Sequence, residues 1–289
     1  MKDFPLPVRG IGPGSQPTEG DEASTIDMPR EVEVFAMPYV PDVADSAAAR
    51  ECRDVLARLA RAMASWDPDE TLGGPTLDLA GVSPAAIELV NQMMGEGEVG
   101  IRIADGRDVR IQESVFTGLW RLREFDVAGR LVRDTIEAAG VPTEALTVLR
   151  SHTTEEVGDV AIPEGAMNVA PIITELRAQM KSWRPGRPAH VINLTLLPVS
   201  PVDLQVIDSV LGSGAVAMIS RGFGNCHVSA TRLRNVWRVQ YFNAMKTLIL
   251  NTVVITQLPE EVIAAPEDIR DTRERFDELL TWVEEAWEL

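Results

Sequence analysis

The sequence predicts an α+β protein built from a tandem duplication, and three observations carry this prediction. Residues that are rare or structurally special recur 117 positions later without a gap. Within each copy, apolar residues first recur at helical spacing and then alternate with polar residues as they do in strands. Self-similarity at one fixed period indicates repeated structural units. The recurring pairs include Trp66/Trp183, Pro68/Pro185, Leu79/Leu196, Trp120/Trp237, Pro142/Pro259 and Glu144/Glu261.

These patterns divide the chain into four segments. We expect an irregular N-terminal arm over residues 1–50, a first repeat unit over 51–150, a second over 168–264 and a C-terminal helix over 266–289. The arm is rich in Pro, Gly, Ser and acidic residues, which disfavour a packed core. A short extended piece is predicted within it at residues 32–37, where apolar and polar residues alternate.

Each unit opens with an amphipathic helix. Apolar residues recur at helical spacing over 55–63 and again over 169–180. Both helices stop at a Ser-Trp-x-Pro sequence, because proline cannot continue a helix. We expect the tryptophan of this sequence to pack back on the helix that it ends.

A short strand and a second helix follow in each unit. The strands are predicted at 77–79 and 191–197. Ser83 and Ser200 are good N-caps for the second helix, and each is followed by a proline, which favours the first helical position. Gly95 and Gly212 follow the last apolar residues of these helices, where a left-handed C-cap is expected.

An antiparallel meander of about four strands completes each unit. Apolar and polar residues alternate over 99–103, and an Asp-Gly turn leads into a second run that ends near residue 111. Further runs are expected at 119–125 and 131–138, although 127–139 could also form a helix. The second copy repeats the pattern at 215–221, 226–231, 236–242 and 247–256.

The C-terminal segment breaks the repeat. Pro266 with two acidic residues after it makes a good helix start, because carboxylates face the positive end of the helix dipole. An apolar stripe then runs to Trp287, so we expect a helix over about 266–287. We expect this helix to dock as a cap on the second unit; the alternative is a partner-binding helix.

Composition narrows the function classes. The net charge of −17 would repel a phosphate backbone, so we expect no nucleic-acid partner. No apolar run is long enough to span a membrane, and no secretory signal is visible. With two cysteines, Cys52 and Cys226, a cytoplasmic location is expected. Phosphate-binding loops, nucleophile elbows and histidine pairs at metal-ligand spacing are missing, so the sequence predicts a non-enzyme without a cofactor.

The two copies diverge most where the second copy carries less charge and more aromatic and amide side chains. Such groups are typical of interaction surfaces. The alternative is that the differences serve packing between the units. Cys226 also precedes His227, which leaves a metal or iron–sulfur handling role as an alternative hypothesis, although strand neighbours point to opposite faces. The candidate partner-binding residues are Arg221, Phe223, Asn225, Cys226, Trp237, Gln240, Tyr241 and Asn243; no metal ligand set is predicted.

Several motifs in these regions resemble one known family. They are residues 12–17 (Gly-Pro-Gly-Ser-Gln-Pro), 221–226, 235–243, 248–252 and 265–268. The sequence resembles the hydrogenase expression/formation proteins of the HupH/HyaF type, with Phe223 where tyrosine is usual and Arg238 where a second tryptophan is common. The resemblance implies a cytoplasmic accessory chaperone or scaffold in the maturation of an uptake [NiFe] hydrogenase. The implied partners are the iron–sulfur small-subunit precursor, which carries a twin-arginine export signal, and other maturation proteins.

Overall fold

The computed structural model describes residues 46–151, 153–222 and 224–287. The first unit comprises helix α1 (Ser46–Ala64), strand β1 (Thr76–Asp78), helix α2 (Pro84–Met94) and strands β2 (Val99–Ile103), β3 (Asp108–Glu113), β4 (Leu119–Phe125) and β5 (Leu131–Ala138). The second unit repeats this order as α4 (Val169–Ser182), β6 (His190–Asn193), α5 (Pro201–Leu211), β7 (Val216–Ser220), β8 (Asn225–Ala230), β9 (Val236–Phe242) and β10 (Leu248–Ile255). Helix α3 (Thr143–Ser151) follows the first unit, while a short 3₁₀ helix, η1 (Glu260–Val262), and α6 (Pro266–Ala286) follow the second.

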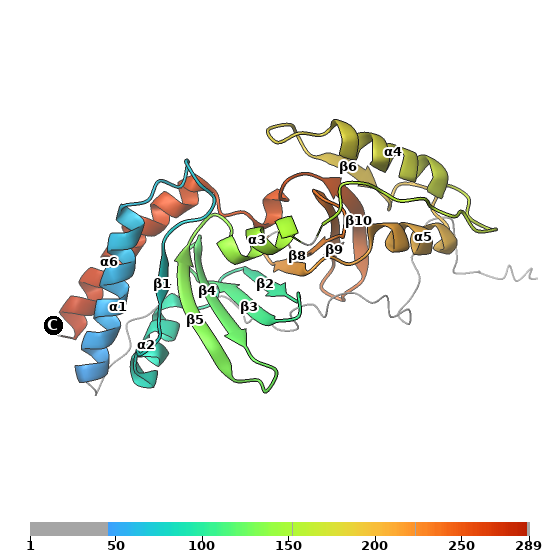
Figure 1. Ribbon diagram of the computed structural model, residues 1–289. Coiled ribbons are helices and arrows are strands. Elements are labelled where there is room, and N and C mark those ends of the chain that lie inside the picture. The colour runs from blue at the N-terminus through green and yellow to red at the C-terminus, as the bar shows by residue number, and fades with distance from the viewer. Residues whose placement is uncertain (1–45, 152, 223, 288–289) are drawn as a thin grey trace, which may run out of the picture.

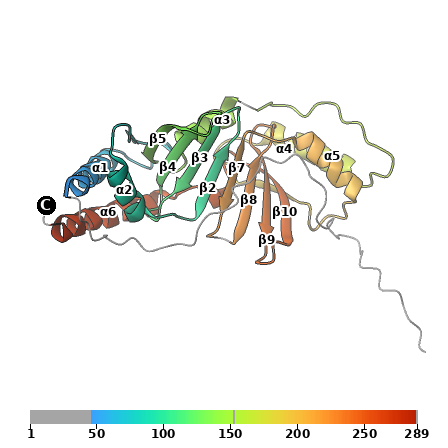
Figure 2. The same ribbon diagram turned by 90° about the horizontal axis from the view of Figure 1, so that it is seen from below.

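One antiparallel sheet joins the two units. Among the described residues its ten strands follow the order β1-β5-β4-β3-β2-β7-β8-β9-β10-β6. The units meet where β2 pairs with β7, and Ile101 lies opposite Met218 there. These two residues hold the same position in the two copies, so a pseudo-twofold axis passes through them and the duplication forms an internal pseudo-dimer. Figures 1 and 2 show the continuous sheet, with helices of each unit at its two ends. The predicted α+β class and antiparallel pairing are confirmed.

The N-termini of the second helices are capped as the sequence predicts. The Ser83 side chain accepts a hydrogen bond from the Ala86 N–H, and Ser200 forms a capping box with Asp203. Asp203 is fully buried, and its Oδ1 also accepts hydrogen bonds from the N–H groups of residues 167–169. This one carboxylate therefore accepts hydrogen bonds from backbone N–H groups at the start of both α4 and α5.

The prediction of left-handed C-caps at Gly95 and Gly212 is correct for the backbone angle φ and wrong for ψ. Gly95 and Gly212 have the expected positive φ, 54° and 59°, but ψ values of −167° and 176°. The left-handed cap needs a ψ near +45°. Each glycine instead leads the chain straight from the helix toward the strand at the centre of the sheet.

The tail of each unit packs on the other unit, which corrects the expected docking of the C-terminal helix. Helix α6 lies along α1 of the first unit (Figure 1), where the rings of Phe276 and Phe116 are 5.2 Å apart between centroids. The reason is the path of the chain after η1: the Ala264 N–H donates to the Gly140 carbonyl of the first unit at 2.9 Å. This hydrogen bond holds the start of the following helix next to the first unit.

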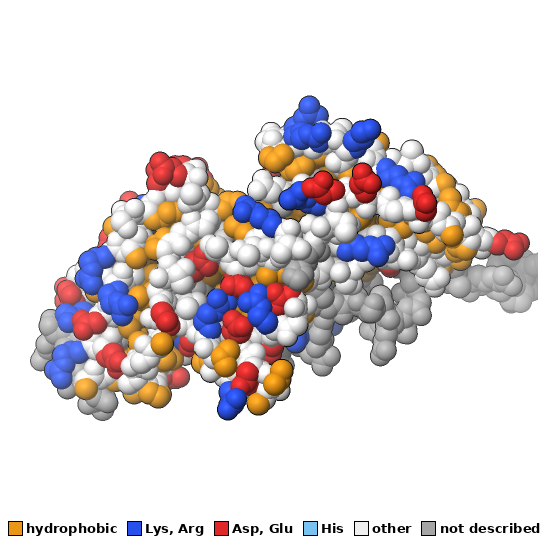
Figure 3. All heavy atoms as spheres, viewed as in Figure 1, with side chains coloured by type: hydrophobic (Ala, Val, Ile, Leu, Met, Phe, Trp, Pro, Cys, Tyr) orange, Lys and Arg blue, Asp and Glu red, His pale blue; other side chains and the backbone are white. Residues whose placement is uncertain are grey.

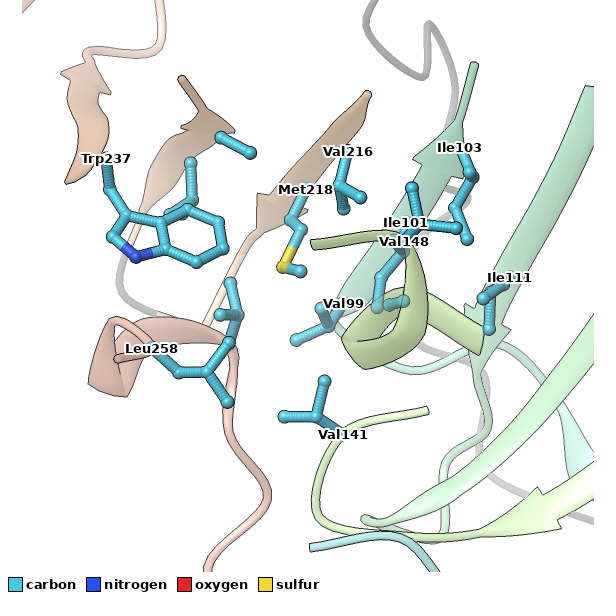
Figure 4. Close-up of a cluster of buried hydrophobic side chains, with 14 of the residues drawn as sticks. Val99, Ile101, Ile103, Ile111, Val141, Val148, Val216, Met218, Trp237 and Leu258 are labelled. Carbon is cyan, nitrogen blue, oxygen red and sulfur yellow. The ribbon is translucent and has the colours of Figure 1, made fainter. Parts of the chain in front are cut away.

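Three apolar clusters form the core. The central cluster joins both units on one face of the sheet beneath α3 and η1, and Figure 4 shows Val99, Ile101, Val216 and Met218 within it. The two outer clusters pack α1, α2 and α6 against one end of the sheet, and α4 and α5 against the other. The outer clusters lie on the opposite face, because neighbours along a strand alternate between faces.

Several element boundaries differ from the predictions. Helix α1 begins at Ser46, inside the range given to the arm, and residues 131–138 form a strand and not the alternative helix. Helix α3 was not expected. The extended piece predicted at 32–37 lies outside the described residues. None of the helices in the described ranges is long and apolar enough to cross a membrane.

Candidate partner-binding site

The turn between β7 and β8 sits against the first unit. The Arg221 N–H donates to the Glu98 carbonyl at 3.1 Å, and burial lowers the pKa of the partly buried Arg221 guanidinium. A side chain at Gly222 would meet Glu98 Oε2 at 1.9 Å, so glycine lets the turn approach this carboxylate without displacing the Glu98 side chain. Phe223 lies outside the described residues. The turn then enters β8 at Asn225, which is exposed.

On the face that carries the central core, Cys226 and Tyr241 lie opposite each other in β8 and β9. The Tyr241 hydroxyl donates to Glu261 Oε1 at 2.9 Å. Burial raises the pKa of the fully buried Cys226 thiol to about 12, and burial and then Glu261 raise the pKa of Tyr241. Both groups are therefore neutral hydrogen-bond donors at pH 7.

The same place in the first unit holds a network of charges. Arg107 bridges Asp105 and Glu144, and Arg133 bridges Glu124 and Glu144. Figure 3 shows this mixture of blue and red spheres over β4 and β5. In the second copy the matching positions hold Gly222, Gly224, Tyr241, Leu250 and Glu261. The second unit has therefore replaced four charged side chains by neutral ones and kept a single carboxylate.

The opposite face carries the amide residues of the prediction. Asn225 and Gln240 lie on this face with His227 and Phe242, whose rings are 4.6 Å apart between centroids. Gln240 Nε2 donates to Asn251 Oδ1 at 3.4 Å, and burial lowers the pKa of His227. This surface is polar but carries little charge, which suits a specific protein contact more than long-range steering.

Trp237 and Asn243 have structural roles in this conformation. Trp237 lies in the central core, 3% exposed (Figure 4), and its Nε1 donates to the Thr256 carbonyl at 3.1 Å. Trp120 does the same with Ala139 in the first copy, at 2.8 Å. Asn243 Oδ1 accepts hydrogen bonds from the N–H groups of residues 245 and 247 and so shapes the β9–β10 turn.

The predicted residues therefore do not form one patch. Arg221, Asn225 and Gln240 are accessible near the β7–β8 turn, and Tyr241 is reached from the other face. Cys226 and Trp237 are buried, so they position the strands and add no contact area. Sequence reasoning missed the Tyr241–Glu261 hydrogen bond. The signal was present, because Glu261 is the repeat partner of Glu144 while Tyr241 stands where the first copy has Glu124.

Metal binding finds little support in this geometry. Cys226 and His227 point to opposite faces, as strand neighbours do, and a thiol with a raised pKa is a poor metal ligand because the thiolate is the ligating form. In the part of the chain that the structure describes, no group of three or more His, Cys, Asp or Glu side chains is arranged to hold a metal ion.

Comparison with known proteins agrees with the fold and the motifs. One family model, described as the C-terminal conserved region of the HupH hydrogenase expression protein, matches twice, at residues 35–155 and 166–283. The chain is 40% identical to the hydrogenase expression/formation protein HoxQ of Cupriavidus necator, over 98% of this chain and 99% of that one. It is 38% identical to HupH of Rhodobacter capsulatus over 97% and 98% of the two chains, and 32% identical to the Escherichia coli hydrogenase-1 operon protein HyaF over 96% of each.

These matches define a duplicated hydrogenase accessory protein as the class of molecule. The chain belongs to the HupH hydrogenase expression protein family, and the double match shows two repeated regions in the chain. A solved structure of the hydrogenase expression protein HupH from Thiobacillus denitrificans also matches, with 24% identity and a TM-score of 0.35, over 39% of this chain and 95% of that one.

Proposed function

We propose that this protein is an accessory chaperone or scaffold in the maturation of an uptake [NiFe] hydrogenase, and that it binds the iron–sulfur small-subunit precursor. The observation that carries the proposal is the match of both units, across nearly the whole chain, to hydrogenase expression/formation proteins. The chemistry of the described residues adds to it, because the site offers hydrogen-bonding and aromatic groups and no activated nucleophile.

Electrostatics support this assignment. The chain carries a net charge of −17, whereas an export signal that contains paired arginines is basic. Opposite charges raise the rate at which two proteins meet more than they tighten the final complex. We propose cytoplasmic action, because the precursor has to be held before export.

The contact surface is assigned to the β7–β8 turn with the accessible face of β8 and β9. The second copy presents Asn225 and Gln240 there, where the first copy has Asp108 and Arg123. Because the two units share one fold and these strand positions are accessible, the residue of one copy is a suitable replacement at the matching position of the other. The pair of copies thus supplies its own control substitutions.

The test is capture of the small-subunit precursor by the tagged full-length protein. We expect the wild-type protein to retain the precursor and the double variant Asn225→Asp, Gln240→Arg to retain much less. The matched control Arg123→Gln makes the reverse exchange in the first unit and is expected to leave capture unchanged. If the wild-type protein fails to bind the precursor, and hydrogen uptake survives deletion of the gene, the proposed function is refuted.

A further inference from the structure

The two units differ in what covers their outer helices. On the first unit, α6 lies across the turn at residues 115–118: Thr272 Oγ1 donates to the Thr117 carbonyl at 2.8 Å, and Phe276 contacts Phe116. The apolar residues of α6 recur at helical spacing and are buried against α1 and α2. One face of this amphipathic helix therefore completes the first outer cluster.

The matching turn of the second unit, at residues 232–235, is met by no helix that corresponds to α6 in the part of the chain that the structure describes. Within the described residues it is met by the segment 153–167, which has no helix and a single bridge, between Thr154 and Leu233. The Thr154 N–H donates to the Arg232 carbonyl at 2.7 Å, and the Arg234 N–H donates back to Thr154 at 2.8 Å. On the second unit this irregular segment, residues 153–167, therefore covers the turn in place of a helix such as α6.

A cavity lies beside the segment 153–167. It measures about 680 Å³ and lies between the segment and α5, with Val157, Val160, Val202, Val206 and Leu233 among its lining residues. The position of Leu233 corresponds to that of Phe116, the aromatic partner of α6. The cavity therefore lies where the first unit accommodates the apolar face of its covering helix.

Exposed apolar side chains also occur in this segment and in the loop that leads into α5. Ile162 is 52% exposed, Met167 75% and Leu196 81%, and Figure 3 shows orange spheres gathered over this end of the molecule. Leu79, the repeat partner of Leu196, is 2% exposed. A leucine kept in both copies is thus buried in the first and open in the second. Exposed apolar side chains that gather in one region of a protein often mark an interaction site.

Acidic residues outnumber basic ones around the cavity, whose charged lining residues are Glu156, Asp159 and Arg232. The segment contributes Glu155, Glu156, Asp159 and Glu164, and no Lys or Arg occurs between Arg150 and Arg177. The nearby arginines are engaged: Arg232, which lines the cavity, donates to the Ser209 carbonyl at 2.9 Å, Arg234 pairs with Glu155, and Arg177 donates to the Gly158 carbonyl at 2.6 Å. We call the cavity and its surroundings the groove. A partner segment that carries basic residues is therefore attracted to this groove by the acidic residues around it.

We propose that the groove between the segment 153–167 and α5 is a docking site for an amphipathic helix of a partner protein. The helix presents an apolar stripe to the groove, as α6 does on the first unit, and basic residues to the acidic residues around it. This inference rests on the proposed carrier function and adds to it a second contact surface, remote from the β7–β8 turn, together with the chemistry of the segment that it holds.

The test uses two fluorescein-labelled synthetic helical peptides of roughly 18 residues, or about five turns. Both carry the same leucine stripe; one has lysines and the other glutamates on the polar face. Fluorescence anisotropy with the full-length protein is expected to show binding of the lysine peptide and at least about tenfold weaker binding of the glutamate peptide. Absence of binding by the lysine peptide overturns the proposal, and so does equal binding of the two.

Exposed positions provide variants that leave the fold intact. Met167→Glu and Leu196→Glu each place a charge beside the groove. Both are expected to lower the affinity for the lysine peptide at least about tenfold. The controls are Val132→Glu and Met245→Glu, at positions 59% and 82% exposed on the β4–β5 and β9–β10 hairpins, and they are expected to change nothing. Weakening of equal size in a control overturns the assignment to this groove.

Capture of the small-subunit precursor separates this inference from the proposed function. If wild type and Leu196→Glu retain the precursor equally, the groove is not the docking site, while the carrier function stands. If wild type retains none, the carrier function fails whatever the peptides do. Loss of the precursor in Leu196→Glu, with retention in Met245→Glu, supports both.

Discussion

Replacement of Asp134 by asparagine tests how much the buried ion pair between Arg121 and Asp134 contributes to the stability of the first unit. In the first unit Arg121 donates from Nε and Nη2 to the two carboxylate oxygens of Asp134, and from Nη1 to Asn91 Oδ1 at 3.0 Å. The two side chains of the ion pair are 11% and 12% exposed. The variant would leave Arg121 largely buried without a charged partner on the neighbouring strand.

The expected loss follows from this burial. Removal of one partner from a buried ion pair costs about 3–5 kcal/mol, because the remaining charge is left without compensation. Asparagine keeps one acceptor oxygen in place, and Asn91 keeps its hydrogen bond. We therefore expect Asp134→Asn to lower the free energy of unfolding by about 3 kcal/mol, the lower end of that range.

The second unit supplies the matched control. There Asn251 stands at the position of Asp134, and Arg238 pairs with Asp208 of α5 at 3.2 Å. Arg238 Nη1 makes this ion pair without hydrogen-bond geometry, and Nε has no hydrogen-bond partner among the described residues. Asn251→Asp offers these atoms a carboxylate, so we expect it to be neutral or stabilising by about 1 kcal/mol.

Urea unfolding followed by tryptophan fluorescence measures both effects, because each unit carries repeated tryptophans. The reasoning is refuted if Asp134→Asn costs less than about 1 kcal/mol, the value for an exposed pair. It is also refuted if Asn251→Asp destabilises by as much as Asp134→Asn does.

Three further predictions concern buried groups. Burial raises the pKa of Glu113 from 4.5 to about 7, so the folded state holds its proton more tightly and stability falls as pH rises between these values; relative to wild type, Glu113→Gln should gain about 3 kcal/mol between pH 4 and pH 8 in urea unfolding, and a pH-independent difference would contradict this. Burial also raises the pKa of both cysteine thiols, Cys52 and Cys226, to about 12; we expect neither to react with a thiol reagent in the native protein and both to react in urea, and native labelling of either would refute this burial. Met218→Ala, at the pseudo-twofold axis, should cost about 2–5 kcal/mol because it opens a cavity, whereas Met245→Ala on an exposed hairpin should stay within about 0.5 kcal/mol; similar losses from the two would contradict the packing at the axis.

Much of the fold was predictable because local chemistry and periodicity decide where elements begin and end. Ser83 and Ser200 start their helices as expected, since an N-cap acts within three residues of itself. The strands after them followed from alternation. Helix α3 was missed, and the matching residues of the second copy, 260–268, form the short 3₁₀ helix η1 and then the start of α6, so the repeat offered no second instance to support it.

The residues of the candidate site were chosen from the sequence, and their role in binding stays a prediction. Divergence between the copies singled out positions where charge is replaced by aromatic and amide groups. A sequence does not show that Trp237 is 3% exposed, or that Cys226 and Gln240 point to opposite faces of the sheet. Those facts depend on which strands pair and on what covers each face.

The sequence by itself determined that this protein is a duplicated α+β molecule, because an offset of 117 residues needs no structure to be seen. Tertiary structure decided how the copies combine. The pairing of β2 with β7 and the docking of α6 on the first unit join residues far apart in the chain. Such contacts depend on the shape of the assembled surfaces, whereas helices, turns and caps depend on neighbours a few residues away.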